Sequence, residues 1–127
     1  MPVYRAPVQD MLFLLNDVLQ IDQYSDLPGF ANASPDMVEA ILTEAGKFCE
    51  DVLFPLNQSG DLEGCTRHAD GSVTTPAGFK EAYKQFIEAG WTQLTQPEAF
   101  GGQAMPHVVG FPAAEFRMSA NHAFAMY

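Results

Sequence analysis

Residues 90–106 read GWTQLTQPEAFGGQAMP and separate two stretches of helical periodicity. Gly90 follows the first stretch and suits the left-handed position just past a helix C-terminus. Pro97 fixes its own φ and favours an extended residue before it. The pair Gly101-Gly102 permits backbone angles that a side chain would forbid. The segment is therefore predicted to be a structured loop between two helices. The positions expected to shape it are Gly90, Trp91, Pro97, Gly101 and Gly102.

Helical patterns also dominate the chain before this loop. A first helix is predicted over about residues 8–19, and because it is apolar nearly all round we expect it to be buried on more than one side. Ser34 and Pro35 form a typical helix start, after which apolar residues recur at steps of three and four. Pro55 cannot donate a helical hydrogen bond, which predicts a kink or an end near Phe54, although the polar stretch from Asn57 to Glu63 could extend the helix irregularly.

Two further helices are predicted around the loop. The first opens at Thr75-Pro76 and stops at Gly90. Its predicted inner face consists of Phe79, Ala82, Tyr83, Phe86 and Ile87. The second runs from about Pro106 to Ser119, and residues 120–127 continue it without a stop signal.

The Asp70-Gly71 turn between these helical segments is compatible with a small hairpin over residues 65–75, although isolated two-stranded hairpins are marginally stable. The predicted fold class is all-α, an antiparallel helical array. We expect residues 1–33 to form an N-terminal extension with the first helix, and residues 34–127 to form one compact helical domain.

The composition excludes several classes of partner. A net charge of −10, from 16 acidic and 6 basic residues, argues against nucleic-acid and anionic-membrane binding. No apolar run approaches the ~20 residues of a membrane span, and no secretory signal is present, so a cytoplasmic protein is expected. Charged residues make up only 17% of the chain, against about 25% in typical proteins. That deficit suggests a surface covered by another domain or subunit.

The sequence carries no self-contained catalytic or metal site. Its three histidines lack the spacing of metal ligands, and its two cysteines form no ligand or disulfide framework. Cys49 is expected in the core, and Cys65 in a polar loop. No acid sits beside a second acid at an apolar position, as a tuned catalytic pair requires. We therefore predict neither a catalytic residue nor a metal ligand in this chain.

Three segments carry a family resemblance. The loop Pro97-Glu98-x-Phe100-Gly101-Gly102 after Ala89-Gly90-Trp91 resembles the N-terminal helical domain of acyl-CoA dehydrogenases. The N-terminal pattern Pro2-x-Tyr4-x-Ala6-Pro7-x-x-Asp10-Met11 is similar to a subgroup of larger bacterial members, which includes the 3-methylmercaptopropionyl-CoA dehydrogenases. So is the segment from Glu63 to Tyr83. The resemblance covers nearly the whole chain, whereas members of the family are several times longer.

This resemblance implies that the chain is part of an FAD-dependent enzyme that dehydrogenates an acyl-CoA thioester at the α and β carbons. In the family, the cofactor contacts and the catalytic glutamate lie mostly in a β-domain and a C-terminal helical domain that this chain lacks. The fragment alone is thus expected to bind no FAD and to be inactive, with acyl-CoA, the missing domains and other copies of the enzyme as the partners of the full protein. Residues 120–127 would form part of the acyl pocket, and the large side chains of that wall are Phe124, Met126 and Tyr127.

Two alternatives remain open from the residues themselves. One is a non-catalytic helical interaction module with the same fold. The other is a small helical ligand-binding protein that uses its Phe- and Met-rich last helix. Plain core packing would explain the aromatic residues after position 120 equally well.

Overall fold

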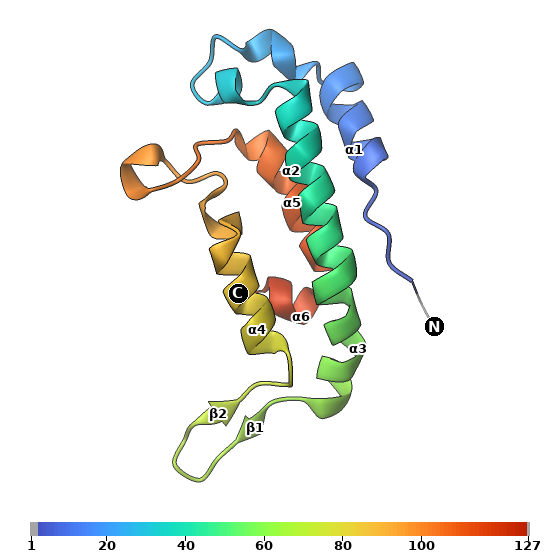
Figure 1. Cartoon of the computed structure of the whole chain (residues 1–127), viewed down its shortest axis with the longest axis vertical. Coiled ribbons are helices and arrows are strands. Elements are labelled where there is room, and N and C mark those ends of the chain that lie inside the picture. Colours follow the sequence, from blue (N-terminus) through green and yellow to red (C-terminus); the bar gives the residue numbers. More distant parts are fainter. Residues whose placement is uncertain (1–2, 127) are drawn as a thin grey trace.

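The fold was analysed in a computed structural model that describes residues 3–126 (Figure 1). It consists mainly of helices, with one very small hairpin, and this confirms the predicted all-α class. The helices are α1 (Val8–Phe13), α2 (Pro35–Phe48), α3 (Phe54–Glu63), α4 (Phe79–Glu88), α5 (His107–Ala120) and α6 (His122–Ala125), and the strands are β1 (Thr66–Arg67) and β2 (Val73–Thr74).

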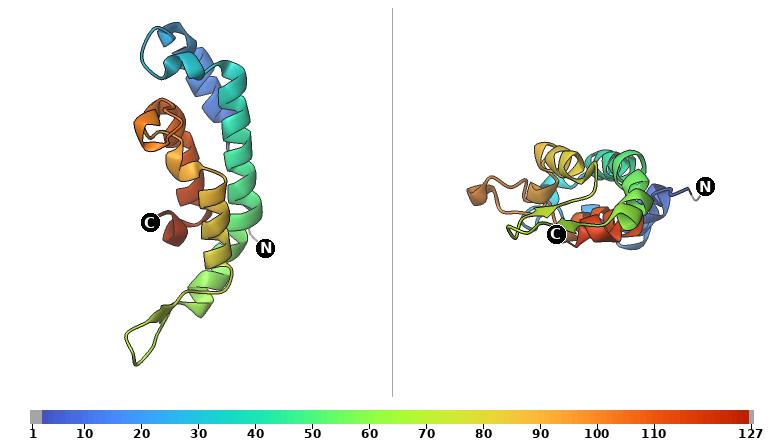
Figure 2. Two further views of the ribbon diagram at one scale, coloured as in Figure 1. Left: turned by 60° about the vertical axis from the view of Figure 1, so that its left-hand side comes forward. Right: turned by 90° about the horizontal axis from the view of Figure 1, so that it is seen from below.

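The longer helices run side by side with alternating direction (Figures 1 and 2). The continuous helical segment that begins with α2 and ends with α3 forms the spine of the molecule. The helix α1 lies against one side of α2, while α5 packs along the same spine and α4 lies beside it. The hairpin projects from the end of the spine. The antiparallel helical array predicted from the sequence is therefore present.

The spine begins as expected but does not end as expected. The Ser34 side chain accepts a hydrogen bond from the Met37 N–H at 3.4 Å, with Pro35 in the first turn. The predicted kink or end near Phe54 is replaced by a π-helical turn, Cys49–Leu53, after which α3 continues to Glu63. In this turn the Phe54 N–H bonds to the Cys49 carbonyl. The wider turn places Pro55 in the first turn of α3, where a missing N–H is tolerated.

The first helix is exposed more than predicted. Its helical path runs through α1 and a π-helical turn, Leu14–Val18, close to the predicted span. Leu12 and Leu15 are buried against the core, but Phe13 is 58% exposed and Val18 is 56% exposed. The prediction of burial on more than one side is therefore wrong, because α1 packs mainly against α2 and its own following turn and leaves its other side uncovered.

The hairpin and α4 also differ in detail from the sequence prediction. The hairpin pairs Thr66 with Thr74 and Arg67 with Val73, as the Asp70-Gly71 turn indicated. The helix α4 begins at Phe79, later than the predicted Thr75-Pro76 start. Ala82 and Phe86 are buried on its inner face, but Tyr83 and Ile87, which were predicted there, are exposed. The face of α4 that contacts α2 and α5 is thus narrower than a hydrophobic pattern alone suggests.

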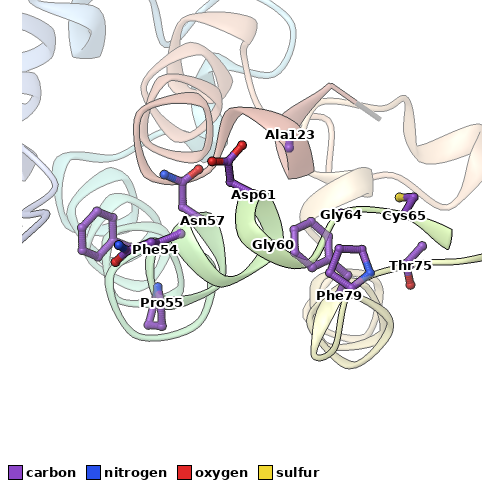
Figure 3. A pocket seen from close by; sticks show the side chains of 12 residues that line it. Phe54, Pro55, Asn57, Gly60, Asp61, Gly64, Cys65, Thr75, Phe79 and Ala123 are labelled. Carbon is purple, nitrogen blue, oxygen red and sulfur yellow. The ribbon is translucent and has the colours of Figure 1, made fainter.

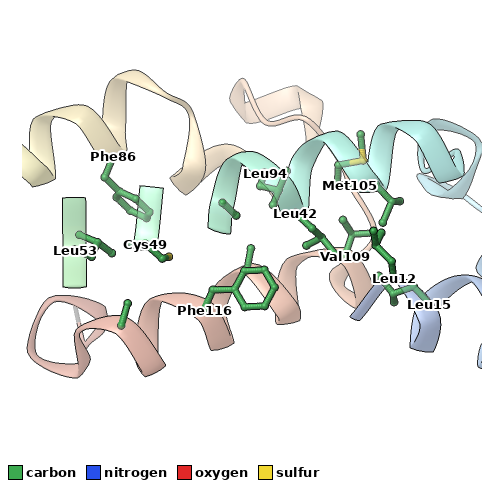
Figure 4. Close-up of a cluster of buried hydrophobic side chains, with 14 of the residues drawn as sticks. Leu12, Leu15, Leu42, Cys49, Leu53, Phe86, Leu94, Met105, Val109 and Phe116 are labelled. Atoms are coloured by element: carbon green, nitrogen blue, oxygen red, sulfur yellow. The ribbon is translucent and has the colours of Figure 1, made fainter. Parts of the chain in front are cut away.

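One hydrophobic core runs along the contact between the spine and α5 (Figure 4). Leu42, Leu53, Val109 and Phe116 are fully buried there, and Cys49 lies among them as a small core residue. Burial raises the pKa of the Cys49 thiol to about 12, despite an opposing effect of Arg117. The thiol is therefore neutral and unreactive near neutral pH. Cys65, in contrast, is exposed at the hairpin.

The N-terminal arm is fastened to the spine by one carboxylate. Glu50 accepts a hydrogen bond from the Ala6 N–H at 2.9 Å and pairs with the Arg5 guanidinium at 2.5 Å. Partial burial disfavours the charged form of Glu50, but these two contacts outweigh it and hold its pKa below the usual value. Farther along, Gly46 leaves room for the Ala6 side chain against α2. The arm therefore follows the surface of the spine instead of extending away from it.

The loop quoted first is held by hydrogen bonds between its two legs. The N–H groups of Gln103, Ala104 and Met105 bond to the carbonyls of Gln93, Gln96 and Leu94 at 2.9–3.0 Å. At its entry Gly90 has a φ of 77°, followed by a 3-10 turn that begins at Trp91. At its tip, the 3-10 turn after Pro97 ends at Gly101, which has a φ of 79°.

The two adjacent glycines at the loop tip are needed for different physical reasons. Gly101 needs a left-handed backbone but has open space where a Cβ would stand. Gly102 has no positive φ, yet a Cβ on it would lie 1.9 Å from the carbonyl oxygen of Gln96. That oxygen belongs to the backbone and accepts the Ala104 N–H at 2.9 Å. Relief of the clash would therefore break the pairing of the two legs.

These observations predict different costs for alanine at the two positions. Gly101→Ala should lower the free energy of unfolding by about 1–2 kcal/mol, the usual cost of a left-handed residue with a side chain. Gly102→Ala should cost more than about 3 kcal/mol, because a backbone clash cannot be relieved by rotation of a side chain. Gly71→Ala is the matched control, since Gly71 has a φ of 86° and open space around it. Urea unfolding measures all three, and equal stability of the Gly101 and Gly102 variants would contradict this account.

Candidate functional site

The junction between α5 and α6 is built around Asn121. This residue is extended, with φ −157° and ψ 92°, and it interrupts the helix that the sequence predicted to continue through residues 120–127. Its side chain is 1% exposed, which makes it the fully buried polar residue in the described part of the chain. A buried amide requires hydrogen-bond partners, because an unsatisfied polar group is costly away from water.

Asn121 uses both ends of its amide. The side-chain oxygen accepts a hydrogen bond from the Phe124 N–H at 3.0 Å and so caps the N-terminus of α6. The Nδ2 group donates to the Leu53 carbonyl at 3.1 Å, which lies at the end of the π-helical turn of the spine. One side chain thus ends α5, starts α6 and fixes α6 relative to the start of α3.

The three residues predicted to form the wall of an acyl pocket differ in how far they are buried. Phe124 is buried, and its ring lies edge-on to Phe86 with the two centroids 5.7 Å apart. Its other aromatic neighbours are Phe79 and Tyr83 of α4. Met126 is 73% exposed, and Tyr127 lies outside the described residues. Within this chain Phe124 is therefore a core residue that holds α6 against α4, while Met126 presents an apolar side chain to the surroundings.

A hollow of about 710 Å³ lies beside α6 (Figure 3). It is bounded by α3, by the two ends of the hairpin, by the start of α4 and by Ala123 of α6. Gly60 lets the Phe79 ring lie directly against α3, since a Cβ at position 60 would come within 2.6 Å of that ring. The lining of the hollow includes Phe54, Asn57, Asp61, Cys65, Phe79 and Ala123.

The lining limits what the hollow can bind. Its surface is largely apolar, with the amide of Asn57 and the carboxylate of Asp61 along α3. No lysine, arginine or histidine lines it, so it provides no cation for a phosphate. Within residues 3–126 no three His, Cys, Asp or Glu side chains gather as metal ligands. The hollow is suited to an alkyl chain or to an apolar side chain of another protein segment.

The predicted loop residues lie away from this hollow. The loop joins α4 to α5 at the opposite end of these helices, and it sets where α5 begins (Figure 1). The histidines are likewise dispersed: His107 starts α5, His122 starts α6, and His68 bonds the Thr74 hydroxyl in the hairpin at 2.6 Å.

Sequence reasoning missed Asn121, the residue that positions α6. A signal was present, because asparagine is a preferred N-cap and its side chain commonly bonds the N–H two or three residues later. The apolar residues on both sides favoured a continuous helix instead. The contact with Leu53 could not be read from the sequence, since 68 residues separate the two partners.

Comparison with known proteins finds three similar curated enzymes. The chain is 38% identical over 123 residues to 3-methylmercaptopropionyl-CoA dehydrogenase of Ruegeria pomeroyi, a match that covers 97% of this chain and 21% of that protein. Over nearly its whole length the chain is therefore similar to an N-terminal part of acyl-CoA dehydrogenases. It is also 30% identical over 125 residues to the broad-specificity linear acyl-CoA dehydrogenase FadE5 of Mycobacterium tuberculosis, and 33% identical over 116 residues to butyryl-CoA dehydrogenase of Syntrophomonas wolfei.

The chain spans about a fifth of the length of the curated relatives that it matches, with 21%, 20% and 18% coverage. No protein-family model matches the chain. Among the described residues, no helix has both the length and the apolar character needed to cross a membrane.

Removal of the Asn121 side chain should destabilise this domain strongly. Asn121→Ala leaves the Leu53 carbonyl and the Phe124 N–H without their partner, at about 1–3 kcal/mol for each buried group that stays unsatisfied. Asn121→Asp keeps an acceptor for the Phe124 N–H but sets a buried carboxylate against the Leu53 carbonyl, so it should also be strongly destabilising near neutral pH. Asn57→Ala, on the exposed face of α3, is the control and should change stability by less than about 0.5 kcal/mol. Chemical denaturation measures each variant, and wild-type stability of Asn121→Ala would refute the proposed role.

Proposed function

We propose that this domain forms one wall of the acyl-binding site of an FAD-dependent acyl-CoA dehydrogenase and has no activity by itself. The reaction class is the α,β-dehydrogenation of an acyl-CoA thioester. The observation that carries the proposal is the 38% identity to 3-methylmercaptopropionyl-CoA dehydrogenase over nearly the whole chain. Two further named acyl-CoA dehydrogenases match the same region, which supports the reaction class but not one particular acyl group.

The arrangement around α6 supports a role as a wall. Asn121 and Phe124 hold α6 from inside the domain, so its outer residues have a fixed position. Met126 presents an apolar side chain there, and Ala123 borders the adjoining apolar hollow. A fixed apolar surface suits an alkyl chain, which needs shape and dryness rather than hydrogen bonds. In this proposal Met126 contacts the acyl group, and Phe124 positions it; Tyr127, also predicted for this wall, lies outside the described residues.

The residues of this domain do not fit a complete FAD site. The 710 Å³ hollow contains the Asp61 carboxylate and no basic residue, and this combination disfavours a pyrophosphate. Among the described residues no Asp or Glu side chain is buried, as a catalytic base shielded from water would be. FAD and the proton-abstracting group therefore belong, in this proposal, to parts of a longer polypeptide. Here the domain supplies binding surface, orientation of the acyl chain and exclusion of water.

The proposal also includes the remaining partners. Exposed apolar side chains such as Phe13, Phe100 and Phe111 would be covered by the missing β-domain and C-terminal domain or by another copy of the enzyme, so a homo-oligomer is expected. A reducing, cytoplasmic setting suits the two unpaired cysteines, one of which is exposed.

A second candidate is a non-catalytic helical interaction module. The same exposed apolar side chains favour it, because a docking protein could cover them without any catalysis. The two proposals differ in what a longer polypeptide does, and that difference can be measured directly.

The 127-residue chain should neither retain FAD nor oxidise an acyl-CoA. A polypeptide of the relatives' length, expressed from the same gene, should co-purify with FAD and reduce an electron acceptor when given an acyl-CoA thioester. Absorbance of the purified protein at flavin wavelengths and acceptor reduction provide the two measurements. Turnover by the short chain would contradict the proposal. A longer polypeptide that folds but carries neither flavin nor activity would favour the interaction module.

Changes at α6 should alter the preference for acyl-chain length in that longer polypeptide. Met126→Ala removes a large apolar side chain from the proposed wall, so kcat/KM should rise for longer acyl chains relative to short ones by about tenfold, the scale of one or two methylenes in an apolar pocket. Phe100→Ala is the control, because Phe100 lies in the turn at the loop tip, away from α6, so its loss can change stability or assembly but not the preference for chain length. If both variants keep the wild-type ratio across an acyl-CoA series, Met126 does not contact the acyl group.

A further inference from the structure

Arg117 is a partly buried cation near the end of α5. Its guanidinium carbon lies 4.9 Å from the centroid of the Phe86 ring, so the side chain passes between α5 and α4. Burial lowers the pKa of Arg117, although the group stays charged at all physiological pH values. The carbonyl end of α5 offsets part of this charge. The aromatic ring and the helix end are the main favourable electrostatic contacts that the described residues give it, with a smaller influence of Cys49.

No acidic side chain neutralises Arg117 within residues 3–126. Ion pairs form at Arg5, Lys47 and Lys84, but none forms at Arg117, and its guanidinium makes no hydrogen bond to the described residues. The neighbouring Cys49 thiol is neutral, because burial raises its pKa to about 12. Carboxylates are not scarce, since the chain has 16 acidic residues against 6 basic ones. Partly buried charges are normally paired, so the missing partner calls for an explanation.

A hollow of about 190 Å³ opens next to this guanidinium, between α5 and the loop that starts at Gly90. Its lining includes Trp91, Leu94, Thr95, His107, Phe111 and Arg117. Gly110 brings the loop close to α5, since a Cβ there would lie 2.5 Å from the Thr95 methyl group. The hollow is thus lined by polar and apolar groups in similar measure, with the Trp91 and Phe111 rings and one permanent positive charge among them.

We propose that Arg117 anchors a binding site for a carboxylate that carries an apolar or aromatic group. A guanidinium offers two parallel N–H donors that match a carboxylate, and Trp91 and Phe111 offer apolar surface for the attached group. The volume accommodates a side chain or a small acid, and it is too small for a nucleotide. The same chemistry can come from a side chain of another protein segment or from a free acid. The net charge of −10 repels free anions at long range, which favours the tethered source.

The single tryptophan of the chain lines this hollow, so its fluorescence reports on the site. Phenylacetate is the probe, titrated into the 127-residue chain. We expect a saturable change in Trp91 fluorescence that weakens as salt rises. Phenylacetamide, which has the same ring and no charge, should produce none. An equal response to the two compounds, or no saturable response to phenylacetate, would overturn the proposal.

Substitutions assign the response to Arg117. Arg117→Met keeps an apolar side chain next to Phe86 but removes the charge, and phenylacetate should bind at least tenfold more weakly. Arg67→Met, in the exposed hairpin, is the matched control and should bind as the wild type does. Circular dichroism verifies the fold of each variant. If Arg117→Met does not fold, Arg117→Lys keeps the charge without the forked donors and should weaken binding by a smaller factor. Binding within twofold of the wild type in the folded Arg117 variants would show that the arginine has only a packing role.

A longer polypeptide from the same gene distinguishes the two sources of the carboxylate. This part alone rests on the proposed function, because it assumes that further domains follow the chain. If one of their side chains fills the site, phenylacetate should bind the short chain and not the long one. If the ligand is a free acid, both should bind it. Failure of the FAD and activity tests leaves the phenylacetate result on the short chain unaffected, so the two proposals can fail separately.

Discussion

The hydrogen bonds of Asn121 are the constraint on which the geometry near the candidate site depends. A single buried amide spans from the α5–α6 junction to the Leu53 carbonyl, and it caps α6 through the Phe124 N–H. Because the group is away from water, neither bond can be exchanged for a bond to solvent without loss. The direction of α6 is therefore set by hydrogen-bond geometry as well as by aromatic packing against α4.

The spine supplies the other half of this arrangement. A proline at position 55 would end an ordinary α-helix, but the π-helical turn Cys49–Leu53 takes up the change in hydrogen bonding and lets the helix continue into α3. The same turn bears the Leu53 carbonyl that receives Asn121, and Cys49 and Leu53 are both fully buried in the core. As a result α3 extends past the core and forms the floor of the 710 Å³ hollow.

The chain exposes more surface than a compact monomer of its mass. Its accessible surface is 8161 Å², whereas a compact monomer of 13.9 kDa is expected to expose about 6,700 Å². Large apolar side chains on α1, on the loop tip and on α5 contribute to this excess. The excess agrees with relatives that are about five times longer, in which further domains can cover such surfaces. An unpaired Arg117 next to an open hollow is consistent with the same view.

The local features of this protein were determined by its sequence alone. The helix start at Ser34, the hairpin turn at Asp70-Gly71 and the left-handed Gly90 each depend on a residue and its immediate neighbours, so local patterns predict them. The loop motif and the N-terminal pattern also pointed to the family.

Only the tertiary structure decided the features that depend on distant partners. The exposed side of α1, the helix that continues past Pro55 and the break at Asn121 all follow from which surfaces meet in space. A hydrophobic period shows that a residue is apolar, but it does not show whether a partner is present to bury it. An asparagine becomes a structural anchor here only because folding brings a carbonyl 68 residues away within hydrogen-bond distance.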